Sequence, residues 1–263
     1  MALHNGGDWV RKVRGRLAGA LPARAAAPGE FRMYPAERLQ HALLVASFTV
    51  LVWTGFALKY PTEFWARPLV AWEDSWPVRG TVHRMAGAIF LATSLLHALL
   101  LVSSARLREH WKDLWPRRSD VAEALAGFAY NLGLRRDQPA LARHSYVEKA
   151  EYWAVVWGAV IMGGTGLMLW ANTFFLAWLP KTALDLATVV HFYEAVLATL
   201  AILVWHFYFV IFDPDVYPMD MAWLTGRTSA DHLRETRPGY CESLLRKQEA
   251  EAPSQEEGPG TEI

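Results

Sequence analysis

The sequence predicts an all-α membrane protein, a bundle of four transmembrane helices. Three observations support this fold class. The 263-residue chain contains four long apolar stretches, 53% of its residues are hydrophobic, and its charged residues, 20% of the total, gather between the stretches. Each stretch is close to the ~20 residues needed to cross the hydrocarbon core of a bilayer. One such stretch is compatible with the core of a soluble domain, whereas four in succession favour a membrane bundle.

The four spans are expected at about residues 41–59, 82–104, 152–170 and 184–212. The first follows a polar leader and has no small-residue cleavage site after its apolar core, so we do not expect a cleaved signal peptide. Composition predicts a partly disordered leader at residues 1–33 and a mostly disordered tail at residues 231–263. Residues 34–230 are expected to form the helical domain.

Lysine and arginine are concentrated in three segments: the leader, the connection between spans two and three, and the tail. The other two connections hold only Arg67, Arg79 and Lys181. The positive-inside rule therefore predicts that both termini are cytoplasmic in a multi-pass protein of a bacterial inner membrane. Trp72 and Trp178 fall in the outer connections, where indole rings favour the lipid headgroup region.

The composition excludes several classes of function. Lys+Arg and Asp+Glu both total 26, so there is no basic excess of the kind that binds nucleic acid. The single cysteine excludes an internal disulfide, a covalent CxxCH haem site and a cysteine-bound iron–sulfur cluster. The chain also has no molybdenum- or nickel-binding motif, so a catalytic centre for a second substrate is expected on a partner.

An internal repeat predicts two helical hairpins of similar design. The first span ends in Thr54-Gly55 and the third in Thr165-Gly166, and the span that follows each carries two histidines. Spans two and four should therefore cross the membrane in the same direction.

Five of the nine histidines fall in the spans, where an ionisable residue indicates a functional site. They are His41, His83, His97, His191 and His206. His83 and His97 are 14 residues apart, and His191 and His206 are 15 apart. In an α-helix each pair is separated by roughly 21–22 Å with a net rotation of about −40° or +60°, so both members point to the same side.

This spacing predicts two b haems stacked across the membrane, each iron held by two imidazoles. His83 faces His191 near the outer surface. Near the inner surface His41, His97 and His206 compete for two positions, and the hairpin repeat favours His97 with His206. Zinc or non-haem iron would need three or four ligands at one level, and the spans offer pairs instead.

A series of short segments carries a family resemblance. In chain order they are Glu37-Arg38-Leu39-Gln40-His41 with Phe48 and Thr54-Gly55, His83-Arg84 with Gly87, Glu148-Lys149, His191, His206-Phe207-Tyr208 and the region of Gly226. Together they resemble the membrane cytochrome b subunits of the formate dehydrogenase gamma type, and those of hydrogenases and thiosulfate reductases look similar. The resemblance covers about residues 34–230.

The resemblance implies a four-helix protein with two haems that passes electrons between a periplasmic redox partner and a quinone near the inner face. In that family the ligands come from spans one, two and four, which implies His83 with His191 outside and His41 with His206 inside. The chain departs from the pattern at Ala42, where a Trp is usual, and in having His97. A displaced His97 would be placed to hydrogen-bond an inner-haem propionate or the quinone. As a ligand it would match the cytochrome b of quinol–cytochrome c complexes.

Other side chains are candidates for roles around these groups. Arg84 and Arg79 could pair with haem propionates at the outer level. Glu194, one turn after His191, could orient a ligand imidazole. A site for menaquinone or ubiquinone is expected at the start of span three. Its hydrogen bonds and protons would come from His144, Tyr146 and Lys149.

The sequence therefore predicts a dihaem cytochrome b, the electron-transfer subunit of a respiratory complex linked to the quinone pool. The expected partner is a periplasmic iron–sulfur or catalytic subunit, or a multihaem c-type cytochrome. The alternative is a haem-free membrane anchor, or a transporter of protons or metal ions that uses the histidines, although the broken-helix signals of many transporters are missing. A ferric or superoxide reductase would need an outer acceptor site, for which the sequence shows no motif.

Overall fold

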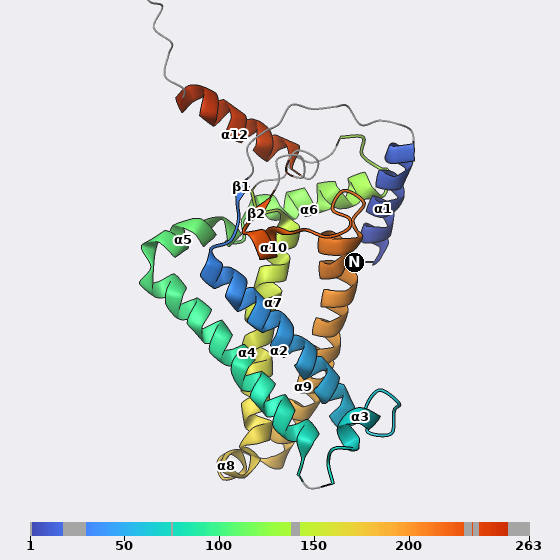
Figure 1. Cartoon of the computed structure of the whole chain (residues 1–263), viewed down its shortest axis with the longest axis vertical. Coiled ribbons are helices and arrows are strands. Elements are labelled where there is room, and N and C mark those ends of the chain that lie inside the picture. The colour runs from blue at the N-terminus through green and yellow to red at the C-terminus, as the bar shows by residue number, and fades with distance from the viewer. Residues whose placement is uncertain are drawn as a thin grey trace, which may run out of the picture.

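A computed structural model describes most of the chain. The described residues are 2–17, 30–74, 76–137, 143–228, 233 and 237–251. Four helices are long and apolar enough to cross a membrane, namely Pro35–Lys59, Val78–Ser103, Tyr146–Trp170 and Lys181–Phe212. The prediction of an all-α membrane bundle with four spans is therefore confirmed (Figure 1).

The first two spans are α2 (Pro35–Lys59) and α4 (Val78–Ser103). The third is α7 (Tyr146–Trp170), and the fourth consists of α9 (Lys181–Leu200), η2 (Ala201–His206) and η3 (Tyr208–Phe212). The short elements are α3 (Arg67–Val70), α5 (Ala105–Trp111), η1 (Lys112–Leu114), α6 (Arg118–Asn131), α8 (Asn172–Leu176) and α10 (Ala222–Thr225). Helices α1 (Ala2–Leu17) and α12 (Pro238–Glu251) flank them.

The first and third spans each begin six residues earlier than hydropathy predicts, because polar residues cap them. Pro35 opens α2 with its fixed backbone angle, and Glu37 accepts a hydrogen bond of 2.7 Å from the backbone nitrogen of Tyr34. Ser145 and Glu148 form a reciprocal capping box at the start of α7. Capping satisfies backbone groups that the first turn leaves without intrahelical partners, so the helices extend beyond the hydrocarbon core.

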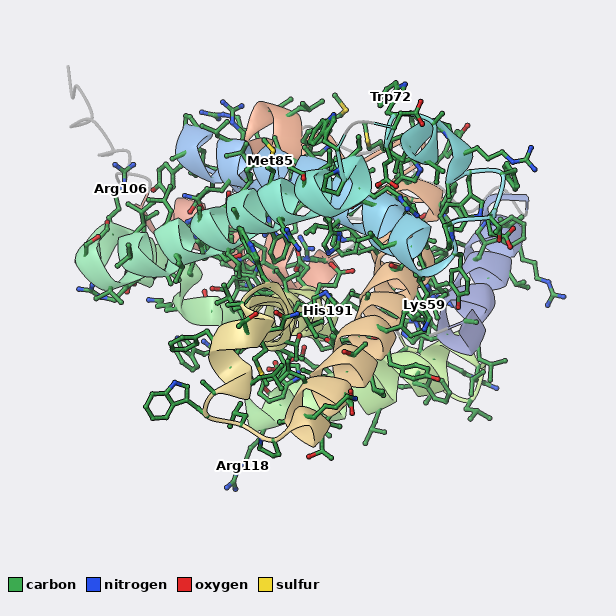
Figure 2. The ribbon with its side chains drawn as sticks, turned by 90° about the horizontal axis from the view of Figure 1, so that it is seen from below. Lys59, Trp72, Met85, Arg106, Arg118 and His191 are labelled. Atoms are coloured by element: carbon green, nitrogen blue, oxygen red, sulfur yellow. The ribbon has the colours of Figure 1, made fainter. Side chains whose placement is uncertain are left out.

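The spans pair as two hairpins, α2 with α4 and α7 with α9, which meet mainly through α4 and α7. Gly163 on α7 allows this approach, because a methyl group there would lie 2.6 Å from Leu91 on α4. Figure 2 looks along the bundle from the end that carries α3 and α8, and it places His191 between the spans. We call that end the outer end and the opposite end the inner end.

The fourth span changes from α-helix to π-helix over η2 and η3. A π-turn contains one residue more than an α-turn and is frequent at functional sites. The η2 segment lies within the 15-residue interval from His191 to His206 and ends at His206.

The leader contains more structure than its composition predicts. Residues 2–17 form α1, which packs against α6 and η2 at the inner end. Asn5 donates a hydrogen bond of 2.7 Å to the carbonyl of Val204 in the π-helical segment, and Asp8 accepts one of 2.7 Å from the Tyr208 hydroxyl. These buried polar contacts, which sequence composition does not reveal, hold α1 against the fourth span. The disorder expected for residues 18–29 falls outside the described residues.

Segments from both ends of the chain also meet at the inner end. Strands β1 (Glu30–Phe31) and β2 (Arg227–Thr228) form an antiparallel pair, with Glu30 opposite Thr228. Gly226 precedes β2 with φ of 77°, and a side chain there would lie 2.6 Å from the carbonyl oxygen of Met33. Only glycine meets both conditions without strain.

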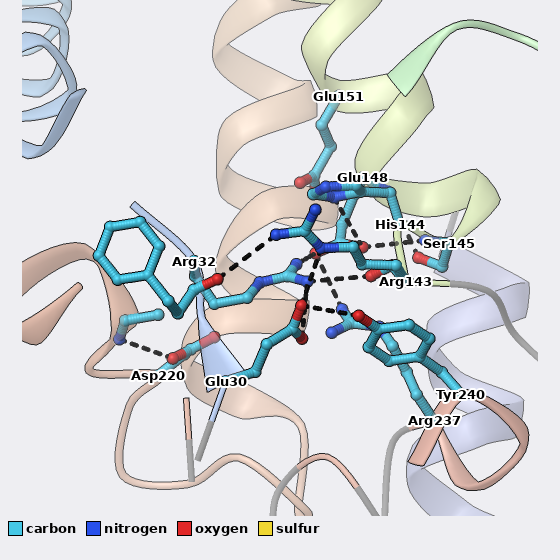
Figure 3. Close-up of polar contacts among 12 residues, drawn as sticks. Glu30, Arg32, Arg143, His144, Ser145, Glu148, Glu151, Asp220, Arg237 and Tyr240 are labelled. Carbon is cyan, nitrogen blue, oxygen red and sulfur yellow. Dashed lines mark hydrogen bonds and ion pairs between the residues drawn. The ribbon is translucent and has the colours of Figure 1, made fainter. Parts of the chain in front are cut away.

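The tail contacts the inner end through an ion pair and a hydrogen bond to partly buried carboxylates (Figure 3). Arg237 and Arg32 lie 2.8 and 2.6 Å from Glu148, and Tyr240 donates a hydrogen bond of 2.9 Å to Glu30. The tail was predicted to be mostly disordered, but residues 238–251 form α12. The prediction for residues 252–263 lies outside the described residues.

Candidate functional site

Two histidines face each other toward the outer end of the bundle. His83 projects from α4 and His191 from α9, with ring centroids 6.3 Å apart and an interplanar angle of 71°. An iron atom bound by two imidazoles on opposite sides, with metal–nitrogen bonds of about 2.0 Å, separates the ring centroids by about 6 Å. The spacing of this outer pair therefore fits the two axial ligands of a haem.

The hydrogen bonds of the outer pair determine which ring nitrogen is available. Thr54 donates its hydroxyl proton to the carbonyl of Val50 at 2.6 Å and lies 3.0 Å from Nδ1 of His83. A threonine hydroxyl has a single proton, so Nδ1 must be the donor in the second contact. Nε2 of the neutral ring then carries a free lone pair, which is the form that binds a metal ion.

His191 has the same arrangement. Thr165 donates to the carbonyl of Ile161 at 2.6 Å and accepts a hydrogen bond of 2.9 Å from Nδ1 of His191. The glycines that follow the two threonines provide space for the rings. A methyl group on Gly55 would lie 3.2 Å from Cε1 of His83, and one on Gly166 would lie 3.3 Å from Cε1 of His191.

A second pair faces at the inner end. His41 on α2 and His206 on η2 have ring centroids 6.5 Å apart and an interplanar angle of 52°. Nδ1 of His206 donates a hydrogen bond of 3.2 Å to the carboxylate of Glu151 on α7. Nδ1 of His41 is buried and has no hydrogen-bond partner among the described residues. The inner pair thus has the spacing of the outer pair but a different hydrogen-bonding environment.

His97 lies near this level but does not face His206. Its Nδ1 donates to the side-chain oxygen of Gln40 at 3.0 Å, and the hydroxyl of Tyr152 donates to its Nε2 at 3.2 Å. Both ring nitrogens are therefore engaged by protein groups. Of the three candidates for the inner level, the structure brings His41 and His206 together and gives His97 other partners.

The residues present fit haem better than an isolated metal ion. Within the described part of the chain, no three histidine, cysteine or carboxylate side chains gather where they could hold a metal ion. The two facing pairs and their spacing suit a planar macrocycle held from both sides.

The charged residues expected around the haems have other partners in the structure. Arg79 is paired with Glu73 at 2.6 Å and also donates to the carbonyl of Ala57. The guanidinium of Arg84 lies 5.9 Å from the ring centre of Trp170. The partner of His191 is Thr165, whereas the carboxylate of Glu194 lies beside Gly158. The acidic residue that contacts a candidate ligand is Glu151.

The three residues expected to bind a quinone point to different neighbours. Tyr146 makes a hydrogen bond of 2.7 Å with Nε2 of His4, and Lys149 is paired with Asp120 at 2.6 Å. His144 is buried and stacks on Trp111 with ring centroids 6.1 Å apart. Burial lowers the pKa of His144 to about 3, against the opposing effect of Glu148 and with a further contribution from nearby arginines, so its ring is neutral.

Sequence reasoning missed Thr54, Thr165 and Glu151 as partners of the facing histidines. The repeated Thr-Gly dipeptide was visible, but its role depends on which helix face packs against the next span. Glu151 lies 14 residues before Thr165, as Gln40 lies 14 before Thr54, and these two residues accept from His206 and His97. The repeat therefore contained a signal that extends to the inner level.

Comparison with known proteins gives one family. The family described as prokaryotic cytochrome b561 matches residues 32–218, which is more than half of the chain and includes all five histidines of the spans. The match confirms the resemblance to membrane cytochrome b subunits. No curated protein matches the chain.

Proposed function

Because the chain belongs to the prokaryotic cytochrome b561 family, it is a multi-pass membrane cytochrome b that binds b-type haem and transfers electrons. We propose that it holds two haems and carries electrons between a periplasmic redox partner and a quinone at the inner end. The observation that carries this proposal is the presence of two facing histidine pairs at different levels of one bundle. When bound, a b haem supplies a one-electron carrier in a medium that otherwise excludes charge.

The proposed ligands are His83 with His191 at the outer haem and His41 with His206 at the inner haem. The facing geometry of these pairs supports this assignment. His97 is not assigned as a ligand, because both of its ring nitrogens are hydrogen-bonded to protein groups. The two levels are separated on the fourth span by 15 residues, which corresponds to about 20 Å. Two carriers in this arrangement divide the membrane crossing into shorter electron-transfer steps.

The dithionite-reduced minus oxidised spectrum of the purified protein, with haem quantified per polypeptide, tests the proposal. We expect two b haems per chain. His41→Ala should leave one haem, and His97→Ala should leave two. A chain purified without haem despite adequate haem supply would overturn the proposal in favour of a haem-free anchor or transporter. If His97→Ala loses one haem and His41→Ala retains two, His97 and not His41 is the partner of His206 at the inner haem.

A cluster of aromatic and polar residues supports the proposed quinone site near the inner haem. Trp111 on α5 stacks with His144 and with Tyr152, at interplanar angles of 23° and 16°. The hydroxyl of Tyr152 bonds His97, and Nε2 of His144 is buried without a hydrogen-bond partner among the described residues. Flat rings and hydrogen-bonding groups are what a quinone headgroup requires. The proposed site thus retains His144 and the displaced His97 and adds Tyr152, whereas Tyr146 and Lys149 bond elsewhere.

Reduction of the haems by a soluble quinol tests this site. His97→Phe and Tyr152→Phe should slow quinol-driven reduction and leave dithionite reduction complete. Tyr193→Phe is the control, because Tyr193 is exposed on α9. Equal quinol rates in all variants would exclude these residues from the quinone site.

The proposed redox partner docks at the outer end, where the chain's own connections are short. It is an iron–sulfur or catalytic subunit, or a multihaem c-type cytochrome. Mild solubilisation of native membranes followed by purification of the tagged chain should recover an iron–sulfur or c-type haem signature together with haem b. Recovery of haem b alone would argue against a stable complex.

A further inference from the structure

We propose that Thr54 and Thr165 are the positioning residues of the outer haem. Each accepts the Nδ1 proton of one axial histidine and so fixes the tautomer and the rotation of the imidazole that presents Nε2 to the iron. This inference rests on the proposed function, because it takes His83 and His191 as the ligands.

The proton arrangement makes each threonine a one-way acceptor. Its own proton is committed to a carbonyl one turn earlier at 2.6 Å, and the oxygen then accepts from the imidazole at 3.0 Å for Thr54 and 2.9 Å for Thr165. The side chain of Thr54 is fully buried. The threonine oxygen lies within hydrogen-bonding distance of this Nδ1 donor, and a donor left without an acceptor in the bundle would be costly.

The arrangement occurs twice, once in each hairpin. The same Thr-Gly dipeptide on α2 and on α7 serves the outer histidine of the next span in each hairpin. Four other threonines in the spans make the backbone bond alone. They are Thr49, Thr93, Thr188 and Thr199, each of which donates to the carbonyl four residues earlier. The structure describes no hydrogen bond from any of these four to a histidine, so the backbone bond by itself does not explain Thr54 and Thr165.

The inner level differs in charge. His206 donates to the carboxylate of Glu151, and Nδ1 of His41 has no partner among the described residues. A negatively charged acceptor increases the electron donation of an imidazole more than a neutral hydroxyl does, because it draws the Nδ1 proton more strongly. Variants of the two threonines should therefore alter the outer haem and leave the inner haem unchanged.

Replacing threonine by valine keeps the shape and removes the acceptor. The buried Nδ1 donor then lacks a partner and the ring is free to rotate, so the outer haem should bind about 10- to 100-fold more weakly. The imidazole also donates less electron density to ferric iron. The midpoint potential of the outer haem should consequently rise.

The test uses the full-length holoprotein in detergent. Thr54→Val and Thr165→Val are compared with Thr54→Ser and Thr165→Ser, which keep the hydroxyl, and with Thr49→Val on the same helix as Thr54. The measurements are haem per polypeptide, the EPR spectrum of the oxidised haems, and the midpoint potential of each haem. We expect the two valine variants to change the EPR signal and raise the potential of one haem, with recovery in the serine variants and no change in Thr49→Val.

Two outcomes would overturn the positioning role. One is an unchanged outer-haem EPR signal and potential in both valine variants. The other is an equal loss of both haems that serine does not rescue, since that is the result of a structural role. His83→Ala separates this failure from failure of the proposed function: if it leaves haem content and both EPR signals unchanged, the ligand assignment itself is wrong.

Discussion

At the scale of single residues, the glycines beside the outer histidines have a role that differs from ordinary helix packing. Gly166 lies against Cε1 of His191, whereas Gly164, two residues earlier on the same helix, has no atom within 4 Å of an added methyl group. The two positions share a helix and a composition but differ in what they contact. This difference provides a matched pair for an experiment.

Gly166→Ala should disturb the outer haem, because the added carbon would lie 3.3 Å from the imidazole and push the ring from its position. Gly164→Ala should leave the haem spectrum unchanged and favour the helix by about 1 kcal/mol. EPR of the oxidised protein and thermal unfolding in detergent measure the two effects. Identical EPR spectra for both variants and the wild type would show that the His191 imidazole tolerates the added methyl group without moving.

Buried His144 should make stability depend on pH. Burial lowers its pKa from 6.5 to about 3, so the unfolded chain binds a proton that the folded chain does not between these values. The free energy of unfolding should therefore fall as the pH falls below about 6.5, by about 1 kcal/mol at pH 5.5.

His144→Phe keeps a flat ring against Trp111 and removes this titration. The midpoint of thermal unfolding should decrease less between pH 7 and pH 5.5 in the variant than in the wild type. A variant with the same decrease as the wild type would assign the acid sensitivity to other groups.

At the scale of elements, α1 stabilises the π-helical end of the fourth span through a buried ionic cluster. Lys12 lies 2.9 Å from Asp8 and 2.5 Å from Asp213, which follows η3 directly. These neighbouring carboxylates raise the pKa of Lys12, and burial raises the pKa of Asp213. The ammonium therefore offsets a concentration of negative charge at the end of the span that carries His206.

Lys12→Met should destabilise the protein by about 3 kcal/mol, because it removes one partner of a buried ion pair and leaves the carboxylates. Arg14→Met is the control, since Arg14 is exposed on the same helix. Thermal unfolding in detergent compares the two. A Lys12 variant as stable as the Arg14 variant would mean that α1 does not hold the span.

At the scale of the whole molecule, the two described ends of the chain lie on one side of the bundle. Helices α1 and α12 are at the inner end with α5 and α6, and α3 and α8 are at the outer end (Figure 1). The connections at the inner end also carry most of the lysine and arginine. We therefore predict that the inner end is cytoplasmic.

Cysteine labelling in intact cells tests this orientation. In a Cys241→Ser background, an impermeant maleimide should label Thr62→Cys from outside, because Thr62 is exposed at the outer end. Arg135 is exposed in the connection between spans two and three, and Arg135→Cys should be labelled only after the cells are permeabilised. The reverse labelling pattern would show that the inner end faces the outside of the cell.

The sequence by itself determined the fold class, the four spans and the two-hairpin repeat, because these depend on local apolar length and on spacing along the chain. The same information identified His83, His191 and His206 as candidates at two levels. It could not choose between His41 and His97, since helix periodicity gives the face of a residue and not its neighbour across the bundle.

Tertiary structure decided the partners. Which nitrogen of an imidazole is free depends on the hydroxyl or carboxylate that another helix brings within hydrogen-bonding distance, as Thr54, Thr165 and Glu151 show. Helix α1 was missed for the same reason: its buried polar side chains bond to groups about 200 residues away in the sequence. Local sequence specifies helices and depth, whereas hydrogen bonds between distant segments determine which histidine can serve as a ligand.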